Sequence, residues 1–154
     1  NGLDDSKDSL TVKCKVISAD RKRLTAAYTG TLTAENAAHP VDLFYSNTVN
    51  LTQVQNIGLS DYTDAYTMAG YVLSDDVEFS GISADVEAQV LEFRNTLDID
   101  TLTAIFDSAD FPLASEEIWP ESFSYEKQGT IYFSMPVPHA MGDYVIVSFD
   151  PSTK

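Results

Sequence analysis

The clearest structural signal in the chain is the alternation of apolar and polar side chains over residues 10–18, LTVKCKVIS. A polar turn, ADRKR, follows, and residues 24–32, LTAAYTGTL, alternate in the same way. A period of two is typical of a strand that buries one face, and two such runs joined by a short polar turn predict a β-hairpin. Any fold for this chain must therefore contain antiparallel strands near its N-terminus.

The middle of the chain predicts more extended structure and then helices. Residues 41–57 contain VDLFY and TVNLTQVQNI, which favour strands. In residues 62–73 apolar side chains recur at helical spacing, with Ser60 or Asp61 as the N-cap, although MAGYVL also fits a strand. We favour the helix.

A second helix is predicted over residues 84–97, because Gly81 and a capping Ser83 precede an apolar stripe. A shorter helix is predicted from Asp100, which would cap it, with Asp98 as a solvated neighbour. Its buried side chains would be Leu102, Ile105 and Phe106.

The C-terminal part returns to strands after a loop broken by Pro112 and Pro120. SFSYE, a KQG turn, TIYFSM, the loop PVPHAMGD and YVIVSF predict an antiparallel meander. The whole order predicts an α+β fold: an antiparallel sheet from the N-terminal hairpin and the C-terminal meander, with one or two central helices packed on it. We expect a polar leader over residues 1–9 and one globular domain over residues 10–154.

Charge is distributed unevenly along the chain. The net charge is −15, yet six of the nine basic residues fall within the first 23 positions. An acidic body repels phosphate backbones and anionic lipids, so nucleic acid is not an expected partner. Direct membrane insertion is not expected either, because no apolar run approaches the roughly 18 residues that a membrane helix needs.

The opening segment, NGLDDSKDS, is polar and acidic, and the chain begins with Asn1 rather than Met. The segment resembles the spacer that follows the lipidated cysteine in mature envelope lipoproteins of gut bacteria. The resemblance implies an extracellular or cell-envelope location after N-terminal processing. A high-salt cytoplasm is the alternative, because Asp is twice as frequent as Glu and Lys is scarce.

The string YTGTL, residues 28–32, is similar to a strand of the FK506-binding prolyl isomerases. Those enzymes continue with an acidic-glycine turn and a Phe-Asp pair that lines the proline pocket, whereas this chain continues with TAENAAHPVD. Thr-rich and Tyr-rich strands produce such strings by chance. We therefore regard the match as coincidental.

Residue types suited to catalysis are present but not in a diagnostic pattern. The chain has one cysteine, Cys14, in a predicted strand, and two histidines, His39 and His139, beside prolines. Because Cys14 lies mid-strand rather than on an exposed turn or at a helix start, and the histidines lie beside prolines or in loops, we interpret the histidines as solvated loop residues and predict no catalytic nucleophile. The single cysteine excludes an internal disulfide.

Carboxylates offer two further interpretations. Glu116, Glu117 and Glu121 flank Trp119, as in a sugar-cleaving site, but so many acids produce such neighbours by chance. Calcium is the most plausible ion, because residues 98–101, DIDT, or residues 74–76, SDD, offer two carboxylates each. No cofactor and no defined metal site are predicted.

We expect a non-enzymatic extracellular or envelope domain that acts through its surface, in adhesion, scaffolding or self-association. Its partner would be another copy or another protein. A basic hairpin on an acidic body would attract partners electrostatically. The residues predicted for self-association are Lys13, Lys15, Arg21, Lys22 and Arg23.

The alternative is a small-ligand or carbohydrate-binding module with an aromatic-lined pocket. Tyrosine and tryptophan rings are suited to such pockets, because they offer an apolar face and a polar edge. The residues predicted to line it are Tyr62, Tyr66, Tyr71 and Trp119.

Overall fold

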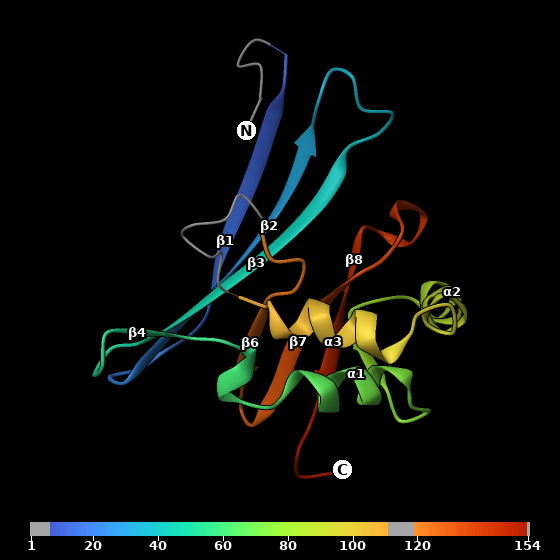
Figure 1. Ribbon diagram of the computed structural model, residues 1–154. Helices are drawn as coiled ribbons and strands as arrows, with labels where there is room; N and C mark the ends of the chain where they lie inside the picture. Colours follow the sequence, from blue (N-terminus) through green and yellow to red (C-terminus); the bar gives the residue numbers. More distant parts are fainter. Residues whose placement is uncertain (1–6, 111–118, 154) are drawn as a thin grey trace.

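The computed structural model describes residues 7–110 and 119–153. Strands, helices and strands follow one another along this part of the chain, and the strands form two antiparallel sheets of four strands each (Figure 1). The predicted α+β class is confirmed. The hairpin and the meander, expected in a common sheet, lie in different sheets, which we call sheet A and sheet B. Residues 1–6 of the predicted leader lie outside the described residues.

Sheet A contains the N-terminal hairpin. Its strands, in spatial order, are β1 (Ser9–Ala19), β2 (Arg23–Thr33), β3 (Val41–Asn50) and β4 (Gln55–Ile57). The predicted hairpin is confirmed: Leu10 lies opposite Leu32, and the pairing runs regularly to Val16, after which a bulge shifts the register. The extended chain predicted over 41–57 is interrupted by a turn, because the side chain of Asn50 accepts the N–H groups of the second and third residues after it.

Sheet B contains the C-terminal meander. In spatial order it consists of β5 (Glu78–Ser80), β8 (Tyr144–Phe149), β7 (Thr130–Pro136) and β6 (Ser124–Lys127). The turn between β6 and β7 is as predicted, with Gln128 and Gly129 at φ of 54° and 90°, as tight hairpin turns require. Strand β5 was not predicted, because three residues carry too little alternation to be recognised.

The helices are α1 (Ala65–Leu73), α2 (Ala84–Arg94) and α3 (Ile99–Asp107). All three predicted helices are confirmed, and Ser83 caps α2 as expected. The other two N-caps were predicted wrongly: they are Asp64 and Asp98, not Ser60 or Asp61 and not Asp100.

Both caps consist of an Asp with a Thr three residues later in the sequence, namely Asp64 with Thr67 and Asp98 with Thr101. Each carboxylate accepts both the backbone N–H and the hydroxyl of its threonine, at 2.6–2.8 Å. Hydrogen bonds from Thr67 lower the pKa of Asp64, and those from Thr101 lower the pKa of Asp98.

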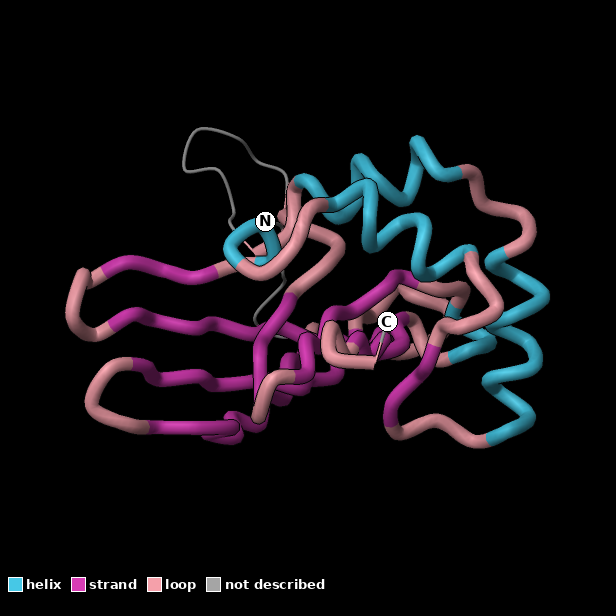
Figure 2. Tube along the Cα trace, turned by 90° about the horizontal axis from the view of Figure 1, so that it is seen from below, coloured by secondary structure: helices cyan, strands magenta, loops and turns pink. Residues whose placement is uncertain are grey.

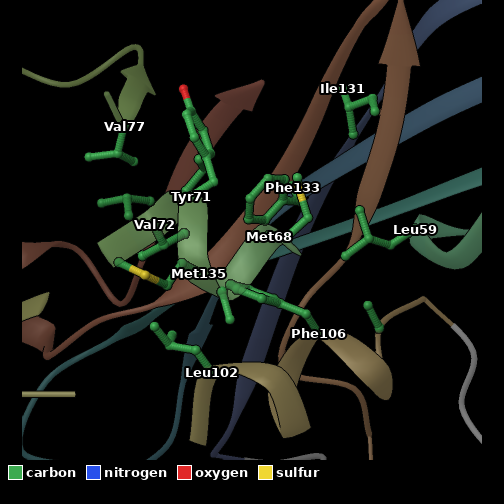
Figure 3. Packing of buried hydrophobic residues seen from close by; sticks show 14 of the residues in the cluster. Leu59, Met68, Tyr71, Val72, Val77, Leu102, Phe106, Ile131, Phe133 and Met135 are labelled. Atoms are coloured by element: carbon green, nitrogen blue, oxygen red, sulfur yellow. The ribbon is translucent and has the colours of Figure 1, made fainter. Parts of the chain in front are cut away.

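The main hydrophobic core lies between sheet B and the helices. Figure 3 shows Phe133 and Met135 of β7 among side chains of α1 and α3, including Met68 and Phe106. The rings of Phe106 and Phe133 meet edge to face with centroids 5.0 Å apart. Sheet A contributes no side chain to this cluster of described residues, so the helices and sheet B form the stable centre of the domain.

Sheet A packs beside this centre through β3 and extends away from the helices (Figure 2). The ring of Phe44 lies against Tyr125 of β6 and Tyr144 of β8. Further along, Arg23 of β2 forms an ion pair with Glu126 at 2.5 Å, and the hydroxyl of Ser46 donates to the Ser124 carbonyl. The two sheets are therefore joined by aromatic and polar contacts along β3 and at the start of β2.

Two buried ionisable side chains tie the helices to their neighbours. Asp110, just after α3, accepts hydrogen bonds from Leu59 N–H, from Ser124 N–H and from the Ser124 hydroxyl, at 2.5–2.7 Å. Arg94, at the end of α2, donates to the carbonyls of Val72 and Ser74 at the end of α1. Each satisfies backbone or side-chain groups that the fold would otherwise leave buried and unpaired.

Candidate functional site

The most unusual surface of the described chain is strand β1. It has eleven residues, and only Ile17 among them is even half-buried. Because β1 is at the end of the strand order, it pairs with β2 on one side only. No other described strand pairs with its second edge, whose backbone N–H and C=O groups can therefore be offered to another chain, a property that most proteins suppress.

The regular part of β1 presents two chemically different faces. Successive side chains point to opposite sides of a strand, so Leu10, Val12 and Val16 share one side with Cys14. We call this the apolar face. Leu10, Val12 and Val16 are 50%, 47% and 58% exposed, and exposed apolar side chains that cluster mark interaction surfaces.

The opposite side of β1 carries Thr11, Lys13 and Lys15, and we call it the lysine face. A groove of about 350 Å³ opens on this side. Its lining comprises Thr11, Lys13, Thr29, Gly30, Thr31, Asp42 and Tyr144. The side chains on both faces of β1 are therefore exposed, apart from the half-buried Ile17.

The five basic residues predicted for self-association fall into two groups. None of the ion pairs within residues 7–110 and 119–153 involves Lys13, Lys15, Arg21 or Lys22, and all four are exposed. Arg23 instead joins the two sheets through Glu126. The β1–β2 turn is fixed by Asp20, whose pKa is lowered by hydrogen bonds from the backbone N–H groups of Lys22 and Arg23.

Close contact between β1 and β2 depends on Gly30. A Cβ at this position would lie 2.7 Å from the Thr11 carbonyl oxygen and 3.2 Å from the Val12 side chain. We predict that Gly30→Ala pushes β1 away from β2 and lowers the free energy of unfolding by about 1–3 kcal/mol. Trypsin should then cut after Lys13 and Lys15 faster than in the wild type.

Gly70 of α1 is the matched control, because a Cβ there meets nothing within 4 Å. Gly70→Ala should stabilise the protein by about 0.5–1 kcal/mol, since alanine is the better helix former. Equal cleavage of β1 in Gly30→Ala and Gly70→Ala would contradict the role given to Gly30.

A second candidate surface is an aromatic groove of about 370 Å³ beside β3. Its aromatic residues are Phe44, Tyr45, Trp119, Phe123 and Tyr144. Trp119 is 57% exposed, and its ring lies 6.2 Å from that of Tyr45. The Tyr144 phenol is a neutral hydrogen-bonding group, and burial raises its pKa further.

The four aromatic residues predicted to line one pocket lie in different places. Trp119 lies in the groove beside β3, and Tyr62 lines another groove with Arg23 and Asp61. Tyr66 is exposed on α1, whereas Tyr71 is buried against β8, where its hydroxyl donates to the Ser148 carbonyl and accepts from Glu78 N–H. The tyrosines around Trp119 were missed, because they come from β3 and β8 rather than from the helical region.

The structure places the described residues that were considered for catalysis as follows. The rings of His39 and His139 stack on each other with centroids 3.4 Å apart, and His139 Nδ1 lies 3.0 Å from Asp143 Oδ1. Cys14 projects from the apolar face of β1. Of the acids near Trp119, Glu121 is exposed, and Glu116 and Glu117 lie outside the described residues.

Asp143 has a structural function that the sequence did not reveal. Its second oxygen, Oδ2, accepts the backbone N–H of Asp42 at 2.7 Å. This hydrogen bond occupies part of the edge of β3 that β4 leaves unpaired. In contrast to β1, β3 thus has a side-chain partner along its edge, from the turn that precedes β8.

No three His, Cys, Asp or Glu side chains within the described ranges come together as a metal site would require. Asp98, one of the proposed calcium ligands, caps α3 through Thr101.

None of the helices in the described part of the chain has the length and apolar composition needed to cross a membrane. Comparison with models of known protein families and with curated proteins finds no match.

Proposed function

We propose that this chain is a non-enzymatic domain of an extracellular or cell-envelope protein, and that it acts through its surface in adhesion, scaffolding or self-association. The observation that carries the proposal is strand β1, an eleven-residue edge strand exposed on both faces. Long exposed edges add strands from other chains, and proteins that do not use them cover or shorten them.

Electrostatics supports the same proposal. Lys13 and Lys15 are exposed and outside any ion pair of the described residues, in a chain of net charge −15. A local positive surface on an acidic protein attracts acidic regions of a second molecule, and salt screens this attraction over about 10 Å at 0.1 M.

The test for self-association is light scattering at low and high salt. We expect larger species at low salt that dissociate at high salt. Lys15→Glu should reduce them, whereas Lys127→Glu, which makes the same change of charge at an exposed position of β6, should not. Particles of one size at every salt concentration would exclude self-association driven by this charge distribution.

The aromatic groove favours a second candidate, carbohydrate binding, because sugar rings stack on exposed aromatic side chains. Trp119 is the only tryptophan of the chain, so intrinsic tryptophan fluorescence reports on this groove alone. If the groove binds sugars, titration with cellotetraose or maltotetraose should change the emission in a saturable way.

Calorimetry on two variants completes this test. Trp119→Ala should abolish the heat of binding, whereas Tyr66→Ala, which removes an exposed ring on α1, should leave it unchanged. An emission spectrum that neither oligosaccharide alters would argue against this second function.

A further inference from the structure

We infer that the free edge of β1 binds an extended segment of another polypeptide, one that alternates carboxylate and apolar side chains. The inference rests on the proposed function, since it specifies the partner of the surface named there. Strand addition supplies affinity through backbone hydrogen bonds and specificity through alternate side chains. The residues that would form the docking edge are Leu10, Thr11, Val12, Lys13, Cys14, Lys15 and Val16.

The chemistry of the partner follows from the two faces of β1. In a sheet, side chains of neighbouring strands that share a face lie about 5 Å apart and interact directly. Carboxylates on the added strand would therefore lie beside Lys13 and Lys15, which have no ion pair in the described part of the chain. Apolar side chains between the carboxylates would cover Val12 and its exposed neighbours on the apolar face.

The length of the docking segment follows from the register. Pairing between β1 and β2 is regular from Ser9 to Val16, and the bulge before Ser18 changes the direction of the edge. The added strand would therefore match about this stretch, with two carboxylates separated by one residue so that both reach the lysine face.

A second copy of this chain does not supply such a strand from its described residues. Two β1 strands paired around a two-fold axis would bring the lysines of both copies together, which is unfavourable. The other strands at the ends of the two sheets are β4, β5 and β6, with 3, 3 and 4 residues. All are too short to match β1, so we assign the added strand to a different polypeptide; the salt-dependent self-association proposed above depends on charge and needs no strand pairing.

The experiment uses the whole chain and synthetic peptides. The probe is an acetylated and amidated peptide, TVEVEVT, and the controls are a scrambled peptide of the same composition and TVKVKVT. Nuclear magnetic resonance of the protein should show saturable shifts in residues 9–17 with the first peptide only. Residues of β7, in the covered centre of sheet B, should not shift.

A charge exchange makes the test specific. Lys13→Glu with Lys15→Glu should weaken binding of TVEVEVT by about tenfold, because two attractive cross-strand pairs become repulsive. The same variant should gain binding of TVKVKVT. Both lysines are exposed, so the variant should keep the wild-type thermal transition.

The outcomes separate this inference from the proposed function. Equal binding of the scrambled peptide, shifts outside β1, or no binding of any peptide would overturn strand addition. If salt-dependent self-association were still observed in that case, the proposed surface function would stand without strand addition. If neither peptide binding nor self-association were observed, the proposed surface function would be wrong as well.

Discussion

Asp110→Ala is expected to lower the free energy of unfolding by about 3–5 kcal/mol, measured by urea unfolding at neutral pH. The substitution leaves three buried donors, from Leu59 and Ser124, without an acceptor, and each buried unsatisfied group costs about 1–3 kcal/mol. Asp110 also has φ of 73°, in the left-handed region, which is less favourable for alanine than for aspartate.

Asp110→Asn is the matched control. Asparagine tolerates positive φ and keeps one acceptor oxygen, but its NH2 group would face the donors of Leu59 or Ser124. We therefore expect the free energy of unfolding to fall by about half as much as in Asp110→Ala. If alanine and asparagine were equally well tolerated, Asp110 would not hold η1 (Leu59–Asp61) and β6 together as described.

The same carboxyl group gives a pH dependence of defined sign. Burial raises the pKa of Asp110 above its ordinary value of 3.8, although hydrogen bonds from Ser124 and Leu59 oppose the increase. The folded state therefore binds this proton more tightly than the unfolded state. The stability that this protonation provides is complete below the ordinary pKa and is lost as pH rises through the higher folded pKa.

This effect is measured as the difference in unfolding free energy between the wild type and Asp110→Asn across the acidic range. The difference should become less favourable to the wild type as pH increases from about 4, since the variant has no titrating group at position 110. A difference that is constant with pH would show that burial does not change the proton affinity of Asp110.

The second large effect is expected for Arg94→Met. Methionine keeps most of the packing of the side chain but removes the donors to the carbonyls of Val72 and Ser74. These carbonyls are at the end of α1, which has no basic residue of its own in its last turn, so the variant also loses a favourable charge there. We expect a loss of about 2–4 kcal/mol in thermal or urea unfolding.

Arg94→Lys should be intermediate, because lysine keeps the charge but lacks the planar fork, in which Nη1 donates to both carbonyls while Nη2 donates to Asp75. Arg21→Met is the control at an exposed position of the first turn and should change stability by less than about 0.5 kcal/mol. Similar unfolding curves for Arg94→Met and Arg21→Met would contradict the role of Arg94.

Local patterns predicted the elements of this fold well where the alternation or the cap was strong. The β1–β2 hairpin, the Ser83 cap of α2 and the turn at Gln128 and Gly129 all depend on residues close together in the sequence. Errors arose where several local signals competed. Ser60, Asp61 and Asp64 are all of residue types that cap helices. Asp64 is the cap, and Thr67, three residues later, donates to its carboxylate.

The arrangement of the elements could not be predicted, because it depends on contacts between distant residues. Phe44 meets Tyr125 and Tyr144 only after β3 has packed beside sheet B. Arg94 and Asp110 belong to the most hydrophilic residue types, and nothing near them in the sequence indicates burial. The lysine pair of β1 was recognised, but the sequence did not show that both faces of that strand are exposed.

The near absence of buried side chains in β1 has a consequence for the dynamics of the domain. Backbone hydrogen bonds to β2 hold this strand, while the hydrophobic cluster that sets global stability lies elsewhere. Opening of β1 should therefore require much less free energy than unfolding of the helices and sheet B. In hydrogen–deuterium exchange its amides would exchange in an early, separate step, which makes the hairpin a locally labile unit on a slowly exchanging core.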